Sequence, residues 1–346
     1  MTILAENTLM FAEAAEASTA AARQMQANAA LIADLATRLK QLSPHIIFTC
    51  ARGSSDHAAT YAKYLFETRL RIPTLSQSPS LSSIYGAPLL HMAGQPFILI
   101  SQSGKSPDLL ASAAAARKAG ALVIALVNDA ASPLAALAEV VVPLHAGPEQ
   151  SVAATKSYIA ALAALAQLTA AWSGDEALSG AIAALPDVLA EAWQADWSGA
   201  LDMLDHARGL YVLGRGMTLG VAQEAALKFK ETCGIHAEAF SIAEVAHGPM
   251  ALIGPDFPLL LLPPNDEGAL GLEPLVAGFA ARGARIAVAE RPYPNTITLP
   301  VAHGLHPVIA PIAMIQSFYR LVNALSVQRG LDPDHPPMLQ KVTETR

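Results

Sequence analysis

The chain has 346 residues, of which 53% are hydrophobic and 15% are charged, and its formal net charge is -7. This length suits two ordinary domains, because a single hydrophobic core rarely keeps growing beyond about 250 to 300 residues. The negative charge excludes a general affinity for nucleic acid or anionic membranes, since no cluster of Lys or Arg offsets it. An anionic ligand must therefore be held by local groups.

Only two cysteines are present, Cys50 and Cys233, and neither lies in a CxxC motif or at a Cys/His spacing typical of metal ligands. This usage is typical of a reducing compartment and argues against a zinc site or a disulfide framework. Residues 1–26 lack the basic and apolar parts of a signal peptide, and no run reaches the roughly 20 apolar residues of a membrane span. We expect a cytoplasmic protein without a metal or cofactor.

In chain order, a helical composition without Gly or Pro from about residue 11 to 42 is followed by short apolar segments that alternate with helical ones. Consecutive helices are expected over 155–206, and a last helix over about 308–329 precedes a polar, Pro-rich tail. The alternation predicts βα units and a parallel sheet. The predicted strands are 45–50, 96–101, 121–127 and 139–143, and then 209–213, 258–262, 284–289 and 296–300.

The same structural unit occurs twice in the sequence, at an offset of about 163 residues. Ala51-Arg52-Gly53-Ser54-Ser55 follows one apolar strand, and Gly214-Arg215-Gly216-Met217-Thr218 follows its counterpart. Downstream, Lys118-Ala119-Gly120-Ala121 matches Ala281-Arg282-Gly283-Ala284. We predict an α/β fold with two similar doubly wound, flavodoxin-like subdomains. The predicted division is an N-terminal helical segment 1–44, subdomains 45–175 and 176–330, and a tail 331–346.

The best phosphate-binding candidate is the segment Ser101-Gln102-Ser103-Gly104-Lys105-Ser106, between a predicted strand and a helix that begins near Pro107. Hydroxyl and backbone N–H groups at a helix N-terminus bind an anion without net positive charge. Open α/β sheets bind ligands at the carboxyl ends of their strands. An ordinary serine-rich turn with an N-cap is the alternative. Gly53, Ser54 and Ser55 could add donors, and the segment 152–156 could supply another wall, although alone it reads as a helix start.

The second half carries acid/base groups instead of hydroxyls. Glu224, Lys228 and Glu231 follow at spacings of four and three, which places them on one helical face. A solvated ion-pair ladder is the simple explanation, and a partly buried carboxylate tuned as a base is the other. His247 precedes Gly248-Pro249, a turn from which a histidine can project into a cleft.

Taken in order, these motifs resemble the sugar isomerase (SIS) domain family, and most closely the isomerase half of the glucosamine-6-phosphate synthases, the glutamine:fructose-6-phosphate amidotransferases. The likeness runs from about residue 45 to the C-terminus. Besides the segments named above, it includes Val152-Ala153-Ala154-Thr155-Lys156, Gly214-Arg215-Gly216, the run from Glu224 to Glu231, Ile235-His236-Ala237-Glu238-Ala239, and the run from Glu244 to Pro249. The family fold implied is two doubly wound subdomains, in agreement with the repeat.

The resemblance also implies roles for single residues. Glu231 would move a proton between C1 and C2, Lys228 would assist at the adjoining hydroxyl, and His247 would open the sugar ring. In the family this histidine comes from a neighbouring subunit, which implies a homodimer. The tail would lie over the substrate, where Lys341 can form an imine with a ketose. The sugar phosphate would be bound by Ser101, Gln102, Ser103 and Ser106, with Ser55 and Val152 near the sugar.

Departures from the family pattern decide the expected activity. The synthases carry a glutaminase domain whose nucleophilic cysteine follows the initiator methionine, whereas Thr2 follows Met1 here. We therefore expect a stand-alone core that releases free ammonia, similar to the glucosamine-6-phosphate deaminases of this fold. Arg52, Lys105 and the pair Pro337-Met338 also depart from the pattern, so the identity of the sugar stays open.

The sequence thus predicts a glucosamine-6-phosphate deaminase and isomerase that forms fructose 6-phosphate and ammonia. The alternatives are a deaminase or isomerase for galactosamine 6-phosphate or a fructosamine phosphate, and a non-catalytic sugar-phosphate sensor. A sensor needs the serine loop but not the acid/base set, so the presence of Glu231, His247 and Lys341 favours catalysis. Residues 1–44 also lack the basic character of an attached DNA-binding segment.

Overall fold

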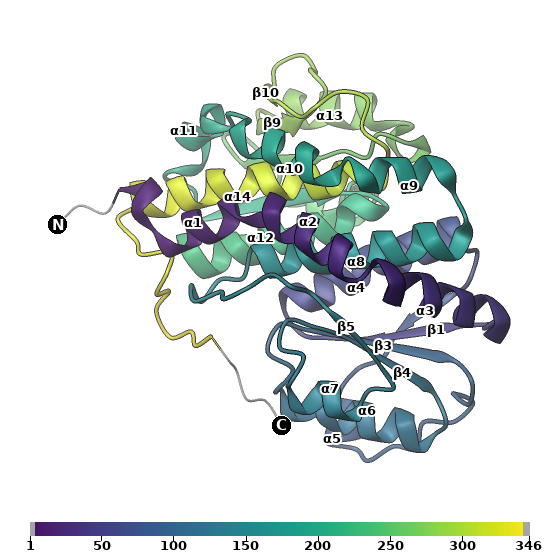
Figure 1. Cartoon of the computed structure of the whole chain (residues 1–346). Coiled ribbons are helices and arrows are strands. Elements are labelled where there is room, and N and C mark those ends of the chain that lie inside the picture. Colours follow the sequence, from purple (N-terminus) through teal and green to yellow (C-terminus); the bar gives the residue numbers. More distant parts are fainter. Residues whose placement is uncertain (1–3, 342–346) are drawn as a thin grey trace. The chain divides into compact units, whose positions relative to one another are not determined.

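The computed structural model describes residues 4–341, which form two compact units, each with its own parallel sheet (Figure 1). The first-sheet unit contains residues 19–149, 156–185 and the described residues from 340 onward. The second-sheet unit contains the described residues up to 18, residues 150–155 and residues 186–339. Met1, Thr2 and residues 342–346 of the predicted tail lie outside the described residues.

The first sheet has five parallel strands in the order β2-β1-β3-β4-β5. Every residue of β1, β3 and β4 is buried, as expected for strands covered by helices on both faces. Figure 1 shows α5, α6 and α7 on one face of this sheet and α3, α4 and α8 on the other. The strands are β1 (Ile47–Cys50), β2 (Thr74–Ser76), β3 (Pro96–Ser101), β4 (Leu122–Val127) and β5 (Val140–Pro143).

The helices that accompany the first sheet begin with α2 (Ala17–Ala27), which spans the division between the units, and α3 (Ala29–Leu42). Those that follow are α4 (Ser54–Arg69), α5 (Ser80–Ser83), α6 (Pro107–Lys118), α7 (Pro133–Leu137), α8 (Lys156–Ser173) and α9 (Glu176–Ala183). The helix predicted over 11–42 is thus three helices, of which α1 (Leu9–Ala15) belongs to the second-sheet unit.

The second sheet also has five parallel strands, in the order β10-β9-β8-β6-β7. They are β6 (Gly209–Gly214), β7 (His236–Ser241), β8 (Pro258–Leu262), β9 (Arg285–Ala289) and β10 (Ile297–Leu299). Its helices include α10 (Leu185–Gln194), α11 (Leu201–Leu204), α12 (Met217–Cys233), α13 (Leu272–Ala281) and α14 (Ala310–Gln328). Short 3₁₀ segments occur at η1 (Ala5–Asn7), η2 (Ser198–Ala200), η3 (Glu244–His247), η4 (Pro249–Leu252) and η5 (Glu267–Ala269).

The predicted repeat is confirmed by the topology and by backbone conformation. Read from its other edge, the second sheet has the order of the first, with β6 in the place of β1. Gly53 caps α4 with φ 57° and ψ -134°, and Gly216, 163 positions later (216 minus 53), caps α12 with φ 62° and ψ -133°. Glycine adopts this positive φ without the steric cost that a Cβ atom imposes. The predicted doubly wound α/β fold is therefore correct.

Two strands are missing from the sequence prediction, β2 and β7, and they occupy equivalent places next to β1 and β6. β2 has only three residues, and β7 has a single buried position among exposed and partly buried ones, so neither has the continuous apolar run by which the central strands were found. Among the described helices, none is both long enough and apolar enough to cross a membrane. No group of three or more His, Cys, Asp or Glu side chains within residues 4–341 could hold a metal ion.

Candidate active site

The predicted phosphate-binding segments lie at the topological switch point of the first sheet. β1 and β3 are neighbours, and the chain leaves them toward opposite edges of the sheet. Residues 51–55 follow β1 and residues 101–106 follow β3, so both segments lie at the carboxyl ends of these adjacent strands. Doubly wound sheets bind ligands in the crevice at this position. The structure therefore brings together the two serine-rich turns that the sequence singled out.

Internal hydrogen bonds and one glycine shape the turn after β3. The Ser101 hydroxyl accepts from the Gly104 N–H at 3.0 Å, and the Ser103 hydroxyl accepts from the Lys105 N–H at 3.3 Å. Gly104 has a φ of 62°, and a Cβ atom there would lie 2.2 Å from the Ser132 Oγ. Only glycine fits this position.

Ser106 is the N-cap residue of α6, and Pro107 is the first residue of that helix. Within the described part of the chain, its side chain makes no capping hydrogen bond. Ser106 therefore occupies the N-cap position, as the alternative expects, but its hydroxyl group does not cap the helix. A hydroxyl that the helix does not use, beside a positive helix end, suits an anionic ligand.

The two cationic residues that depart from the family pattern are both paired with carboxylates. The Arg52 Nε and Nη2 atoms lie 2.8 and 2.7 Å from the Asp108 Oδ2, with Asp108 fully buried and about half of the arginine side chain exposed. Lys105 lies 4.0 Å from Asp129 in a surface pair. A buried carboxylate requires such a partner, so the role of Arg52 that these contacts give is to balance the charge of Asp108.

Three charged residues of α12, Glu224, Lys228 and Glu231, form a mostly buried line. The Lys228 Nζ lies 2.6 Å from the Glu231 Oε2 and 3.2 Å from the Glu224 Oε1. The side chains of Lys228 and Glu224 are 1% and 0% exposed, whereas that of Glu231 is 21% exposed. A solvated ladder would expose all three, so that interpretation does not hold. Burial acts to lower the pKa of Lys228, but the two carboxylates outweigh it and raise the pKa above its ordinary value.

The far end of this line is supported by α14, which packs against α12. The Tyr319 hydroxyl donates to the Glu224 Oε1 at 3.2 Å. The buried carboxylate thus has both an ionic partner and a neutral donor, which lowers the cost of its burial. As a result, the Glu224 end of the line is fixed in the interior, whereas Glu231 at the other end is partly exposed to solvent.

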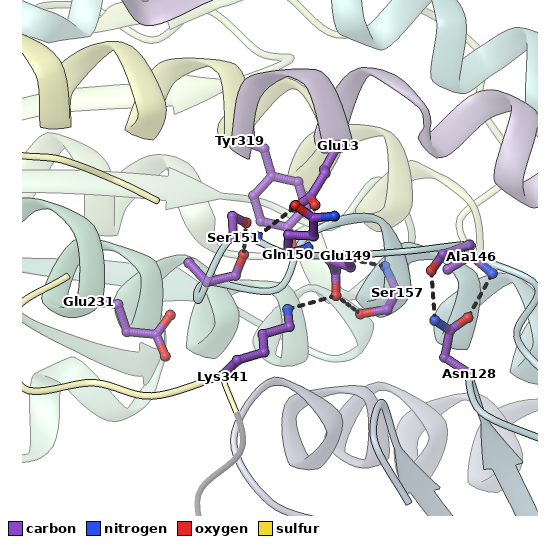
Figure 2. Close-up of polar contacts among 12 residues, drawn as sticks. Glu13, Asn128, Ala146, Glu149, Gln150, Ser151, Ser157, Glu231, Tyr319 and Lys341 are labelled. Carbon is purple, nitrogen blue, oxygen red and sulfur yellow. Dashed lines mark hydrogen bonds and ion pairs between the residues drawn. The ribbon is translucent and has the colours of Figure 1, made fainter. Parts of the chain in front are cut away.

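A carboxylate that the sequence did not single out holds the tail lysine. Glu149, fully buried, accepts from the Ser157 N–H at 3.1 Å, from the Ser157 hydroxyl at 2.6 Å and from the Lys341 Nζ at 3.3 Å (Figure 2). An isolated glutamate three residues before Val152, in a loop otherwise short of charge, was the available signal. Lys341 and its partner are 192 residues apart, so no local pattern could connect them.

The other predicted residues lie on loops and short helices. His247 ends η3 and is exposed, and Gly248 follows it with a φ of 145°. Val152 is partly buried, and its N–H donates to the Asp334 carbonyl at 3.1 Å. The predicted site residues of the second-sheet unit are Val152, Lys228, Glu231 and His247, and those of the first-sheet unit are Gly53, Ser55, Ser101, Gln102, Ser103, Ser106 and Lys341.

A family model described as SIS domain matches residues 42–171 and 203–289 of this chain. A glutamine--fructose-6-phosphate aminotransferase (isomerizing) of Zymomonas mobilis is 32% identical over 322 residues, which cover 88% of this chain and 52% of that protein. The chain thus spans about half the length of the curated relatives it matches.

Solved structures agree with this match. A candidate phosphosugar isomerase of Silicibacter pomeroyi is 40% identical with a TM-score of 0.90, over 94% of this chain and 100% of that one. The C-terminal domain of the glucosamine-fructose-6-phosphate aminotransferase of Francisella tularensis is 25% identical with a TM-score of 0.85, over 95% and 98% of the two chains. Glu13 and Asp334 lie outside the residues that the family model matches.

Proposed function

Because this chain belongs to the SIS domain family, we propose that it is a phosphosugar isomerase that converts glucosamine 6-phosphate and water into fructose 6-phosphate and ammonia. The observation that carries the proposal is the buried Lys228, held between Glu224 and Glu231 on α12. A cation fixed behind a partly exposed carboxylate is the arrangement that a proton transfer at adjacent carbons needs.

In the proposed reaction the phosphate is anchored by the hydroxyl and N–H groups of residues 101–106, with Ser55 nearby. His247 assists the opening of the pyranose to the aldehyde. Glu231 takes the proton from C2 while Lys228 donates a hydrogen bond to the C1 oxygen, which gives an enolamine. Glu231 returns the proton to C1, leaving an imine at C2. Water adds at C2 and ammonia leaves, so one water is consumed for each ammonia released.

Two further parts belong to the same proposal. The tail brings Lys341 over the bound sugar, where its amine can form an imine with the ketose product. The ion pair with Glu149 supports this, because it gives the lysine a fixed position without a bound ligand. The exposed position of His247 supports a homodimer in which this histidine serves the site of the other copy.

The decisive experiment measures ammonia and fructose 6-phosphate from purified protein supplied with glucosamine 6-phosphate. Galactosamine 6-phosphate and a fructosamine phosphate are tested in parallel, and turnover of only one of these would replace the proposed substrate. Binding of all three without turnover would favour a sensor.

The Glu231→Gln variant tests the mechanism. Loss of a positioned carboxylate that transfers protons typically costs about 10² to 10⁴ in rate, so turnover should fall by at least that factor while phosphate binding persists. Glu238→Gln, an exposed change on β7, is the matched control and should keep the wild-type rate. Near-normal turnover by Glu231→Gln would contradict the assigned role.

A further inference from the structure

Three successive backbone N–H groups of the segment 150–152 are bound by groups far away in the sequence. Those of Gln150 and Ser151 donate to the Glu13 carboxylate, the second at 3.2 Å (Figure 2). The N–H of Val152 donates to the Asp334 carbonyl at 3.1 Å. The segment lies outside any helix or strand, yet its backbone donors are paired as completely as those of a regular element.

The same tail residue also fixes the start of the helix that carries Glu13. The Asp334 carboxylate accepts from the N–H groups of Leu9 and Met10, both at 2.7 Å, and the Thr8 hydroxyl accepts from that of Phe11 at 3.1 Å. These donors have no partner inside α1, because the first turn of any helix leaves its N–H groups unpaired. Helix α1, the tail at Asp334 and the segment 150–152 therefore form a closed ring of hydrogen bonds.

The ring depends on two carboxylates that are almost completely removed from solvent. Glu13 is 7% exposed and Asp334 is 8% exposed. Burying ionised groups costs free energy, and the hydrogen bonds to several N–H groups offset that cost. In exchange, the carboxylates give directional contacts that fix backbone groups in place, which apolar side chains in the same positions would not do.

We propose that α1 is a positioning element for the substrate, with Glu13 and Asp334 as its positioning residues. This inference rests on the proposed function, in which the tail lysine lies over the sugar, and on the expectation from the family resemblance that Val152 lies near the sugar. Asp334 lies seven residues before Lys341 in the chain, and Gln150 directly follows Glu149. By binding the segment and the tail together, α1 fixes the backbone of residues 150–152 and of the tail at Asp334 before a ligand arrives.

The test compares Glu13→Gln, Asp334→Asn and the double variant, all in the full chain. Asp175→Asn is the matched control, because this aspartate accepts an N–H at the start of α9 and takes no part in the ring. Amide hydrogen exchange at residues 150–152 is measured together with kcat and KM, at a temperature where every variant is fully folded.

We expect Glu13→Gln to lose protection at Gln150 and Ser151 and to lower kcat/KM about 10-fold, the effect of one weakened hydrogen bond to a charged group. The double variant should lose less than the product of the single losses, since both residues act through α1. The control should keep both its kcat/KM and the protection at 150–152.

Two results would overturn the proposal. One is normal kcat/KM in Glu13→Gln although the amides have lost protection, which would make α1 a purely structural helix. The other is wild-type protection at 150–152 in that variant, which can be seen even if the wild-type protein turns over no sugar phosphate. If the wild-type protein turns over no sugar phosphate, the proposed function fails. The exchange measurement then still decides whether Glu13 holds the segment 150–152.

Discussion

Removal of the Lys228 ammonium is the most informative perturbation, because it separates the stability of the α12 line from its chemistry. In Lys228→Met the side chain keeps a similar length, but Glu224 is left as a buried carboxylate without its cation, with the Tyr319 hydroxyl bond still available to it. Breaking a buried ion pair from one side costs about 3 to 5 kcal/mol, since the remaining charge stays desolvated. Glu231 would be affected less, because it reaches solvent.

The loss can be measured by thermal and urea unfolding. For domains of this size, about 1 kcal/mol corresponds to roughly 2 to 4 °C, so the transition of the second-sheet unit should fall by about 6 to 20 °C. Lys230→Met, an exposed position two residues further along the same helix, is the control and should lose much less.

The double variant Glu224→Gln/Lys228→Met tests whether the loss of stability comes from the unpaired Glu224 carboxylate. Neutralising Glu224 removes the orphaned charge, so most of the lost stability should return, whereas turnover should stay as low as in Lys228→Met. A Lys228→Met protein as stable as the wild type would refute the reasoning, because the lysine would then not be balancing a buried carboxylate. A double variant that regained activity would refute the role of Lys228 in the reaction.

Two further predictions concern the subunits and the thiols. Mixing inactive Glu231→Gln and His247→Gln proteins under subunit exchange should restore up to about a quarter of wild-type activity. Half of the dimers are then mixed, and each mixed dimer has one intact site out of two. No recovery would place both residues in one subunit's site. Burial raises the pKa of both Cys50 and Cys233 to about 12, so neither thiol should react with a thiol reagent at pH 8 in the folded protein. Because these folded-state pKa values lie above the ordinary thiol value of 9.0, the thiols stabilise the fold below pH 9 and lose that contribution between pH 9 and 12. Urea titrations of Cys→Ala variants across this range would detect the loss.

The sequence by itself determined the parts of this protein that depend on local patterns. The glycine turns at Gly53 and Gly216 needed no partner to be recognised, because a positive φ before a helix is a local requirement. Continuous apolar runs identified the central strands, since residues covered on both faces must all be apolar. The repeat then predicted two doubly wound sheets, and the motif order predicted which segments carry chemistry.

Tertiary structure alone decided what those segments contact. The spacing of Glu224, Lys228 and Glu231 was visible in the sequence, but their burial depends on α14, which begins far along the chain. The pairing of Lys341 with Glu149 and that of Glu13 with Ser151 join residues 192 and 138 positions apart. Local propensity carries no information about such pairs, because they form only when folding removes both groups from water and each must find a partner there.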